Sequence, residues 1–291
     1  MNKLLLKSVL AEFPGKMVIV NDHKMHIYTE GKGTPSLVFL SGSGTPSPMY
    51  DFKTLFNKMS DEYQIAVVEK AGYGFSEITN VSRDIDTILF ETRTVLKEAN
   101  INPPYILFPH SMSGIEALYW VQCYPDEIKA IIGLDPALPP FYEKMKLEST
   151  IKTMKFISKL ISGKLKFLLP IITNLLPPIK YGLLNKSDKN ICRALIYYKT
   201  LTNDMINEGL MIKENARKIN IEALKKVPML FFISNGKEAG MKKGEWEKLI
   251  RDYTKELNVE IISFNAGHYL HDILPEEISN KSKIFIKEKL K

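Results

Sequence analysis

The chain has 291 residues, of which 45% are hydrophobic and 25% are charged. These values are typical of a folded globular protein with room for one large domain and an insertion, and they exclude a disordered or fibrous protein. The two cysteines are too few for a disulfide scaffold or a cysteine-ligated zinc site. The initial segment MNKLLLKSVLAEF has only three consecutive apolar residues before Lys7, too few for the core of a signal peptide. We therefore expect a cytoplasmic protein.

The net charge of +7 is unevenly distributed along the chain. Residues 141–226 carry a net charge of +10, whereas the rest of the chain carries −3. Proteins that bind nucleic acid typically interleave basic residues with aromatic residues that stack on bases, or present a basic helix that reads a groove. Neither pattern occurs here, so we predict no nucleic-acid partner.

Eight short apolar or alternating segments predict β-strands. In chain order they are Met17–Val20, Met25–Thr29, Leu37–Leu40, Ile65–Glu69, Tyr105–Phe108, Ile128–Leu134, Met229–Ile233 and Glu260–Phe264. Four further segments have helical spacing: Asp84–Ala99, Gly114–Tyr124, Glu245–Thr254 and Pro275–Lys289. The first two strands predict a hairpin. The later alternation of strand and helix predicts an α/β fold, with a mostly parallel sheet of about eight strands and helices on both faces.

The alternation stops after Pro140. We predict a core domain made of residues 1–140 and 227–291, with a helical cap of residues 141–226 inserted after the sixth strand. One helical face of the cap is apolar and is flanked by lysines; it consists of Met154, Ile157, Ile161, Leu165 and Leu168. Three interpretations stay open for this helix: packing on the core, a lid over an apolar cleft, or weak contact with an anionic membrane surface.

The segment Tyr105–Gly114 runs from an apolar strand through small and polar residues into a predicted helix, and Ser111 lies at the turn. A serine at such a turn presents its hydroxyl clear of the backbone, and the start of the following helix directs amide N–H groups toward the same place. A nearby base can then activate the hydroxyl as a nucleophile. We therefore predict that Ser111 is the nucleophile.

Three motifs make the chain resemble the α/β-hydrolase family in its serine-nucleophile branch. Pro-His-Ser-Met-Ser at 109–113 stands where the family has G-x-S-x-G, with both flanking glycines replaced. Glu-Lys-Ala-Gly-Tyr-Gly-Phe-Ser at 69–76 is similar to the family's D-x-x-G-x-G-x-S loop. The segment 265–272 resembles the family's catalytic-histidine loop. The serine argues against the dehalogenase and epoxide-hydrolase branches, which attack with aspartate.

The resemblance implies a role for several residues. His268 is expected to be the general base, and the amides of Ser43 and Met112 are expected to form the oxyanion hole. The family places the triad acid after either of two strands. Asp135 and Glu238 are the two candidates, and Asp135 is favoured because Glu238 falls one residue short of the usual position. The resemblance implies no metal and no cofactor.

We therefore predict a serine hydrolase that cleaves an ester, thioester or amide bond of a small, partly apolar substrate through an acyl-enzyme. Two alternatives stay open. In the first, the chain is a hydrolase-fold receptor that binds a small ligand with little turnover. In the second, it is an aminopeptidase in which Glu208 or Glu143 binds the substrate amine. The oligomeric state and the natural substrate have no signature in the sequence.

Overall fold

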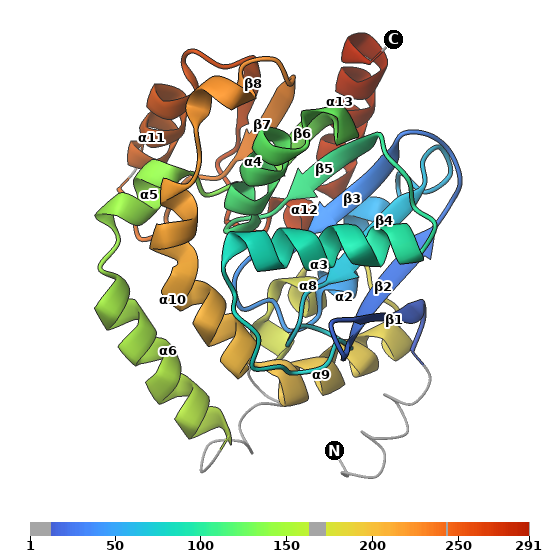
Figure 1. Cartoon of the computed structure of the whole chain (residues 1–291), viewed down its shortest axis with the longest axis vertical. Helices are drawn as coiled ribbons and strands as arrows, with labels where there is room; N and C mark the ends of the chain where they lie inside the picture. The colour runs from blue at the N-terminus through green and yellow to red at the C-terminus, as the bar shows by residue number, and fades with distance from the viewer. Residues whose placement is uncertain (1–12, 163–172, 243, 291) are drawn as a thin grey trace.

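An eight-stranded sheet runs through the middle of the protein (Figure 1). The structure is a computed structural model, which describes residues 13–162, 173–242 and 244–290. The spatial order of the strands is β1-β2-β4-β3-β5-β6-β7-β8. Their bounds are Lys16–Val20, His23–Glu30, Ser36–Leu40, Ile65–Glu69, Tyr105–Pro109, Ile128–Leu134, Met229–Ile233 and Val259–Ser263 for β1 to β8. The first two strands pair antiparallel and β2 pairs antiparallel with β4, whereas all other pairs are parallel. The predicted sheet is thus confirmed.

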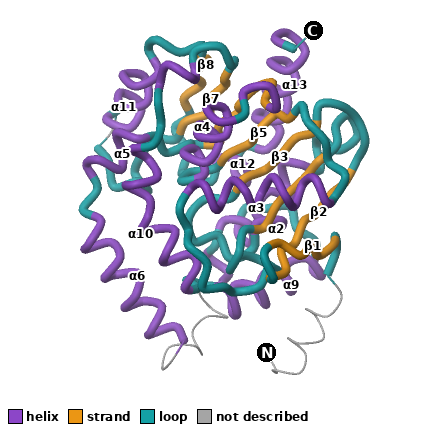
Figure 2. Tube along the Cα trace, viewed as in Figure 1, coloured by secondary structure: helices purple, strands orange, loops and turns teal. Residues whose placement is uncertain are grey.

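Helices cover both faces of the sheet (Figure 2). One apolar cluster joins one face to α3 (Ile85–Glu98), α4 (Ser113–Cys123) and α11 (Glu245–Thr254). A second cluster joins the other face to α2 (Pro48–Phe56), α12 (Leu270–Ile273) and α13 (Pro275–Lys289). In β3, Val38 and Leu40 belong to the first cluster while Leu37 and Phe39 belong to the second. Because successive side chains of a strand point to opposite faces, a strand buried on both faces is apolar throughout.

The ends of the helices follow local rules. Asp84 caps α3 by accepting a hydrogen bond from the amide of Thr87 at 3.0 Å. Pro275 stands in the first turn of α13, where its missing N–H costs nothing. Helix α2 was not predicted. Its nine residues, eight of them buried, are fewer than the roughly 11 to 18 over which a helical period is usually read.

Every regular element that the structure describes between β6 and β7 is a helix. Its elements are α5 (Pro139–Lys144), α6 (Leu147–Ser162), η3 (Thr173–Leu175), α8 (Pro177–Lys180), α9 (Lys186–Lys199), α10 (Asn203–Arg217) and η4 (Ile221–Leu224). Helices α6 and α10 lie side by side along one flank of the molecule (Figure 1). Of the apolar face predicted for α6, Ile157 is exposed, and Leu165 and Leu168 lie outside the described residues.

No helix in the described ranges is both long and apolar enough to cross a membrane. The first twelve residues, which include most of the initial segment discussed above, fall outside those ranges.

Candidate active site

Ser111 sits in the turn between β5 and α4 with a backbone φ of +54°. This left-handed conformation is uncommon for a residue with a side chain, so the surrounding contacts must hold it. The Ser111 carbonyl accepts hydrogen bonds from the amides of Gly114 at 3.0 Å and Ala137 at 2.8 Å. The amide of Ser111 donates a hydrogen bond to the carbonyl oxygen of Leu134 at 3.4 Å. The turn is therefore fixed by the loop that follows β6.

Two glycines allow this turn to pack closely, although neither is a flanking glycine of the family motif. A Cβ on Gly42 would lie 2.9 Å from the Cβ of Ser111, and a Cβ on Gly114 would lie 2.6 Å from the Ala137 carbonyl oxygen. Ser113, in place of the second motif glycine, donates its hydroxyl to the Leu40 carbonyl at 2.6 Å. The close approach that the motif glycines usually permit is thus provided here by Gly42 and Gly114.

The structure pairs His268 with Asp135. The Nδ1 of His268 lies 2.5 Å from Oδ2 of Asp135, whose side chain is fully buried. Oδ1 of the same carboxylate accepts hydrogen bonds from the Ser234 amide at 2.8 Å and from Nε1 of Trp246 at 2.7 Å. With the proton on Nδ1, the opposite ring nitrogen Nε2 is left to accept a proton. The His268 ring lies 4.6 Å from the ring of His110, which directly precedes Ser111.

Glu238, the other candidate acid, contacts the backbone of the histidine loop instead. Its Oε2 accepts a hydrogen bond from the amide of His268 at 3.0 Å. A Cβ on Gly267 would lie 2.7 Å from Oε1 of Glu238, so the glycine lets the carboxylate approach the loop closely. Glu238 therefore shapes the loop that carries the imidazole, while Asp135 contacts the imidazole itself.

Two residues whose amides were predicted to bind an oxyanion come from different loops. Ser43 and Met112 both line a cavity that also includes Ser111. In the part of the chain that the structure describes, neither amide donates a hydrogen bond to a protein acceptor. Amides that have no protein acceptor and lie beside a serine are available to bind an oxyanion.

This cavity, of about 130 Å³, lies between the core and the helices that follow β6. Apart from the loop residues, its lining is mostly apolar and comes from α5, α6, α10 and the turn before α6: Phe141, Tyr142, Met145, Leu147, Thr150, Ile151, Met154, Gly209 and Ile212. None of these lining residues is acidic. The cavity is thus suited to an apolar group.

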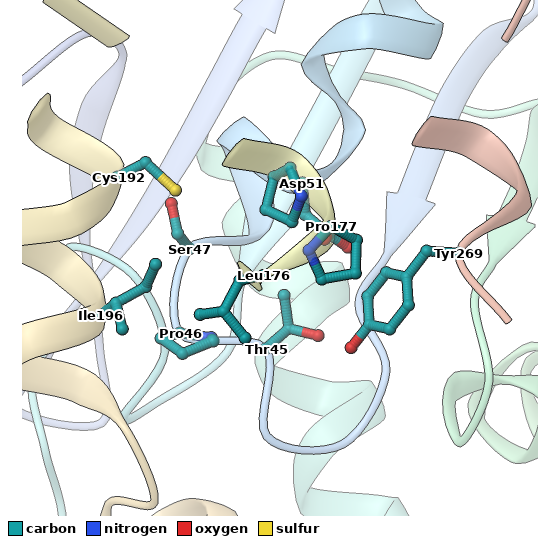
Figure 3. Close-up of a pocket in the computed structure, with 10 residues that line it drawn as sticks. Thr45, Pro46, Ser47, Asp51, Leu176, Pro177, Cys192, Ile196 and Tyr269 are labelled. Carbon is teal, nitrogen blue, oxygen red and sulfur yellow. The ribbon is translucent and has the colours of Figure 1, made fainter. Parts of the chain in front are cut away.

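A second cavity, of about 30 Å³, lies on another side of the loop that follows β3 (Figure 3). Thr45, Ser47, Cys192 and Tyr269 line it, and the Cys192 sulfur faces the Ser47 hydroxyl. Its volume is that of about one water molecule, so it does not accommodate a substrate. Burial raises the pKa of the Cys192 thiol to about 12. This cysteine therefore stays protonated and is not a competing nucleophile.

Among the described residues, one buried group combines metal-ligand chemistry with proximity. It consists of Asp51, His110 and His271, whose ligand atoms lie within 4.8 Å of one another. Nε2 of His271 is already 3.2 Å from Oδ2 of Asp51, and the His271 ring packs 4.7 Å from that of His110. Burial, together with His268 and His271, holds the pKa of His110 well below its ordinary value. We interpret the group as a packing layer against which the His268 ring lies.

Sequence reasoning missed two residues of this site. Trp246 has no local signal, because its bond to Asp135 joins positions 111 residues apart. Gly42 has no local signal either, because its contact with Ser111 depends on the pairing of β3 with β5.

Comparison with solved structures identifies the fold. Epoxide hydrolase VrEH1 from Vigna radiata is 19% identical, with a TM-score of 0.72 over 96% of this chain and 99% of that one. The epoxide hydrolase of Bacillus megaterium is 17% identical, with a TM-score of 0.70 over 94% and 100%. E-2-(Acetamidomethylene)succinate hydrolase is 14% identical, with a TM-score of 0.65 over 95% and 100%. The fold is therefore that of the α/β-hydrolase superfamily, as the motifs predicted.

Comparison with curated sequences is more specific. No family model matches the chain. The uncharacterized protein YbdG of Bacillus subtilis strain 168 is 35% identical over 292 residues, which cover 97% of this chain and 88% of YbdG. The uncharacterized protein YqjL of the same organism is 31% identical over 116 residues, which cover 40% of this chain and 44% of YqjL. The chain belongs to the family of YbdG.

Proposed function

We propose that the protein is a serine hydrolase that cleaves a carboxylic ester of a small, partly apolar substrate through an acyl-enzyme. One observation carries this proposal. The His268 imidazole, paired with the Asp135 carboxylate, packs against His110, which directly precedes Ser111, and Ser111 lines a cavity together with Ser43 and Met112.

The chemistry follows in two steps. His268 takes the proton of the Ser111 hydroxyl as its oxygen bonds to the ester carbonyl carbon, and the amides of Ser43 and Met112 hold the resulting oxyanion. The C–O bond to the alcohol then breaks, and the alcohol leaves with the proton from His268. Water attacks the acyl carbon with His268 again as base, which releases the acid and restores Ser111. Asp135 fixes the imidazole tautomer and stabilises its charged form.

The surroundings of two acidic residues favour an ester over the amine-terminated substrate of an aminopeptidase. Glu208 is buried and bonded to Lys70 and Tyr73, so it is not free to bind an amine. Glu143 is exposed and does not line the Ser111 cavity. A substrate ammonium would therefore enter an apolar cavity without a counter-charge, at a large desolvation cost.

Labelling with a fluorophosphonate probe tests the nucleophile and the base together. Wild type is expected to be labelled on Ser111, and Ser111→Ala is expected to lose the label. The labelling rate of His268→Ala is expected to fall by a factor of about 10³ or more. Ser263→Ala, which changes an exposed serine on β8, serves as the control and retains wild-type labelling. Equal labelling of wild type and Ser111→Ala would refute the proposal. A single slow turnover of p-nitrophenyl butyrate without a steady state would favour the receptor alternative.

A further inference from the structure

Four buried polar side chains form a cluster next to the loop 41–44, which carries Ser43. They are Lys70 and Tyr73 from the loop after β4, Glu116 from α4, and Glu208 from α10. None is more than 4% exposed. Charged groups are rarely buried this deeply unless partners satisfy them, so their bonds show which parts of the fold depend on one another.

Two of these side chains hold the loop 41–44 at its two ends. Nζ of Lys70 donates a hydrogen bond to the carbonyl oxygen of Ser41 at 3.2 Å. The hydroxyl oxygen of Tyr73 accepts a hydrogen bond from the amide of Gly44 at 3.3 Å. Ser43 lies between these two anchored positions. The direction of its amide is therefore set by where Lys70 and Tyr73 are placed.

The same two side chains are themselves bonded to one carboxylate. Nζ of Lys70 forms an ion pair with Oε1 of Glu208, and the Tyr73 hydroxyl donates to Oε2 of Glu208 at 2.5 Å. Glu208 belongs to α10, whose next residue, Gly209, lines the Ser111 cavity together with Ile212. A single side chain of α10 thus connects the wall of the cavity to both anchors of the loop.

We propose that Glu208 is a positioning residue that sets the oxyanion-hole amide of Ser43 through Lys70 and Tyr73. This inference deepens the proposed function and rests on it for the role of Ser43. Removing the Glu208 charge leaves Lys70 buried, with the Glu116 carboxylate 3.9 Å away. Because an unpaired buried cation is costly, Lys70 shifts toward Glu116 and releases Ser41. The packing of α10 against the core therefore also places the Ser43 amide in the oxyanion hole.

The test compares Glu208→Gln with a matched control on the same helix. Asp204 is also a buried acid of α10, and it accepts hydrogen bonds from the Thr79 amide at 2.8 Å and the Thr79 hydroxyl at 2.6 Å. Asp204→Asn therefore loosens the attachment of α10 without touching the loop 41–44. Tyr73→Phe removes one anchor while keeping the ring and the Lys70–Glu208 pair, so it tests the proposal even if Glu208→Gln folds poorly.

Two readouts separate positioning from general loosening. Glu208→Gln and Tyr73→Phe are expected to lower kcat for p-nitrophenyl butyrate by about ten- to hundredfold with KM changed less than about threefold, because a displaced donor matters most in the transition state. Hydrogen exchange of a peptide covering residues 38–46 is expected to quicken at least about threefold in both variants. Asp204→Asn is expected to change neither.

The outcomes distinguish this inference from the proposed function. If the wild type hydrolyses the ester but Glu208→Gln and Asp204→Asn lose activity equally, the inference is wrong and the proposed function stands. Unchanged exchange of residues 38–46 in both Glu208→Gln and Tyr73→Phe also overturns the inference. If the wild type has no esterase activity, the proposed function fails, and the exchange measurement still decides whether Glu208 holds the loop.

Discussion

Asp135 satisfies three donors from three separate segments. One oxygen faces His268, and the other accepts from the Ser234 amide and Trp246. Asp135 itself has a φ of +50°, and its amide donates to the Phe232 carbonyl at 2.7 Å. Such a carboxylate has little freedom to rotate, so it holds the imidazole in one orientation and one tautomer.

This arrangement predicts different effects for the two acids. Asp135→Asn is expected to lower kcat about 10⁴-fold, because an amide facing Nδ1 favours the wrong tautomer of His268. Glu238→Gln is expected to lower kcat less than about threefold, since its amide oxygen still accepts the His268 N–H. Steady-state kinetics with p-nitrophenyl butyrate measure both. A larger loss for Glu238→Gln than for Asp135→Asn would assign the acid role to Glu238.

At the scale of elements, α6 and α10 give the cavity its apolar wall. Ile151 and Met154 face it from α6, and Gly209 and Ile212 face it from α10. A Cβ on Gly209 would lie 3.2 Å from Cδ1 of Ile151 and 3.8 Å from Sδ of Met154. The missing side chain at this position leaves space for part of the substrate.

We therefore expect wild type to hydrolyse p-nitrophenyl hexanoate with a higher kcat/KM than the acetate, because each buried methylene contributes about 0.8 kcal/mol. Gly209→Val is expected to lower kcat/KM for hexanoate about tenfold while changing that for acetate less than about threefold. Leu210→Ala, at the next and exposed position of α10, is the control and keeps the wild-type profile. A flat or inverted chain-length profile of the wild type would contradict an apolar substrate.

At the scale of the whole molecule, a buried carboxylic acid links stability to pH. Burial raises the pKa of Glu116 to about 7, with Lys70 opposing the shift and Glu208 adding to it. Oε1 of Glu116 accepts a hydrogen bond from the Thr92 hydroxyl at 3.0 Å. Between its unfolded pKa of 4.5 and about 7, the folded state retains a proton that the unfolded state has lost. Stability from this group is complete below pH 4.5 and is lost as pH rises through 7.

Glu116→Gln replaces the carboxylic acid with a side chain that does not ionise. The variant is therefore expected to lack this loss of stability with rising pH. The free energy of unfolding of the variant relative to wild type is expected to be greater at pH 8 than at pH 5, by up to about 3 kcal/mol. Urea unfolding at the two pH values measures this difference. Glu98→Gln, at an exposed position of α3, provides the control, and a pH-independent difference for Glu116→Gln would contradict the prediction.

The sequence by itself determined the strands, the longer core helices and the fold class, because these depend on the periodicity of neighbouring residues. The turn at Ser111 was also readable, since a strand, a small polar cluster and a helix follow one another within ten residues. Helix α2 was missed because its nine residues are too few for a clear helical period.

Only the tertiary structure placed Asp135 rather than Glu238 against His268, because both acids follow strands that end at the same edge of the sheet. It alone brought Trp246 to Asp135 and Glu208 to Lys70, positions 111 and 138 residues apart in the chain. A local pattern carries no information about such pairs, since the contacts exist only once parallel strands have aligned their ends and α10 has packed against the core.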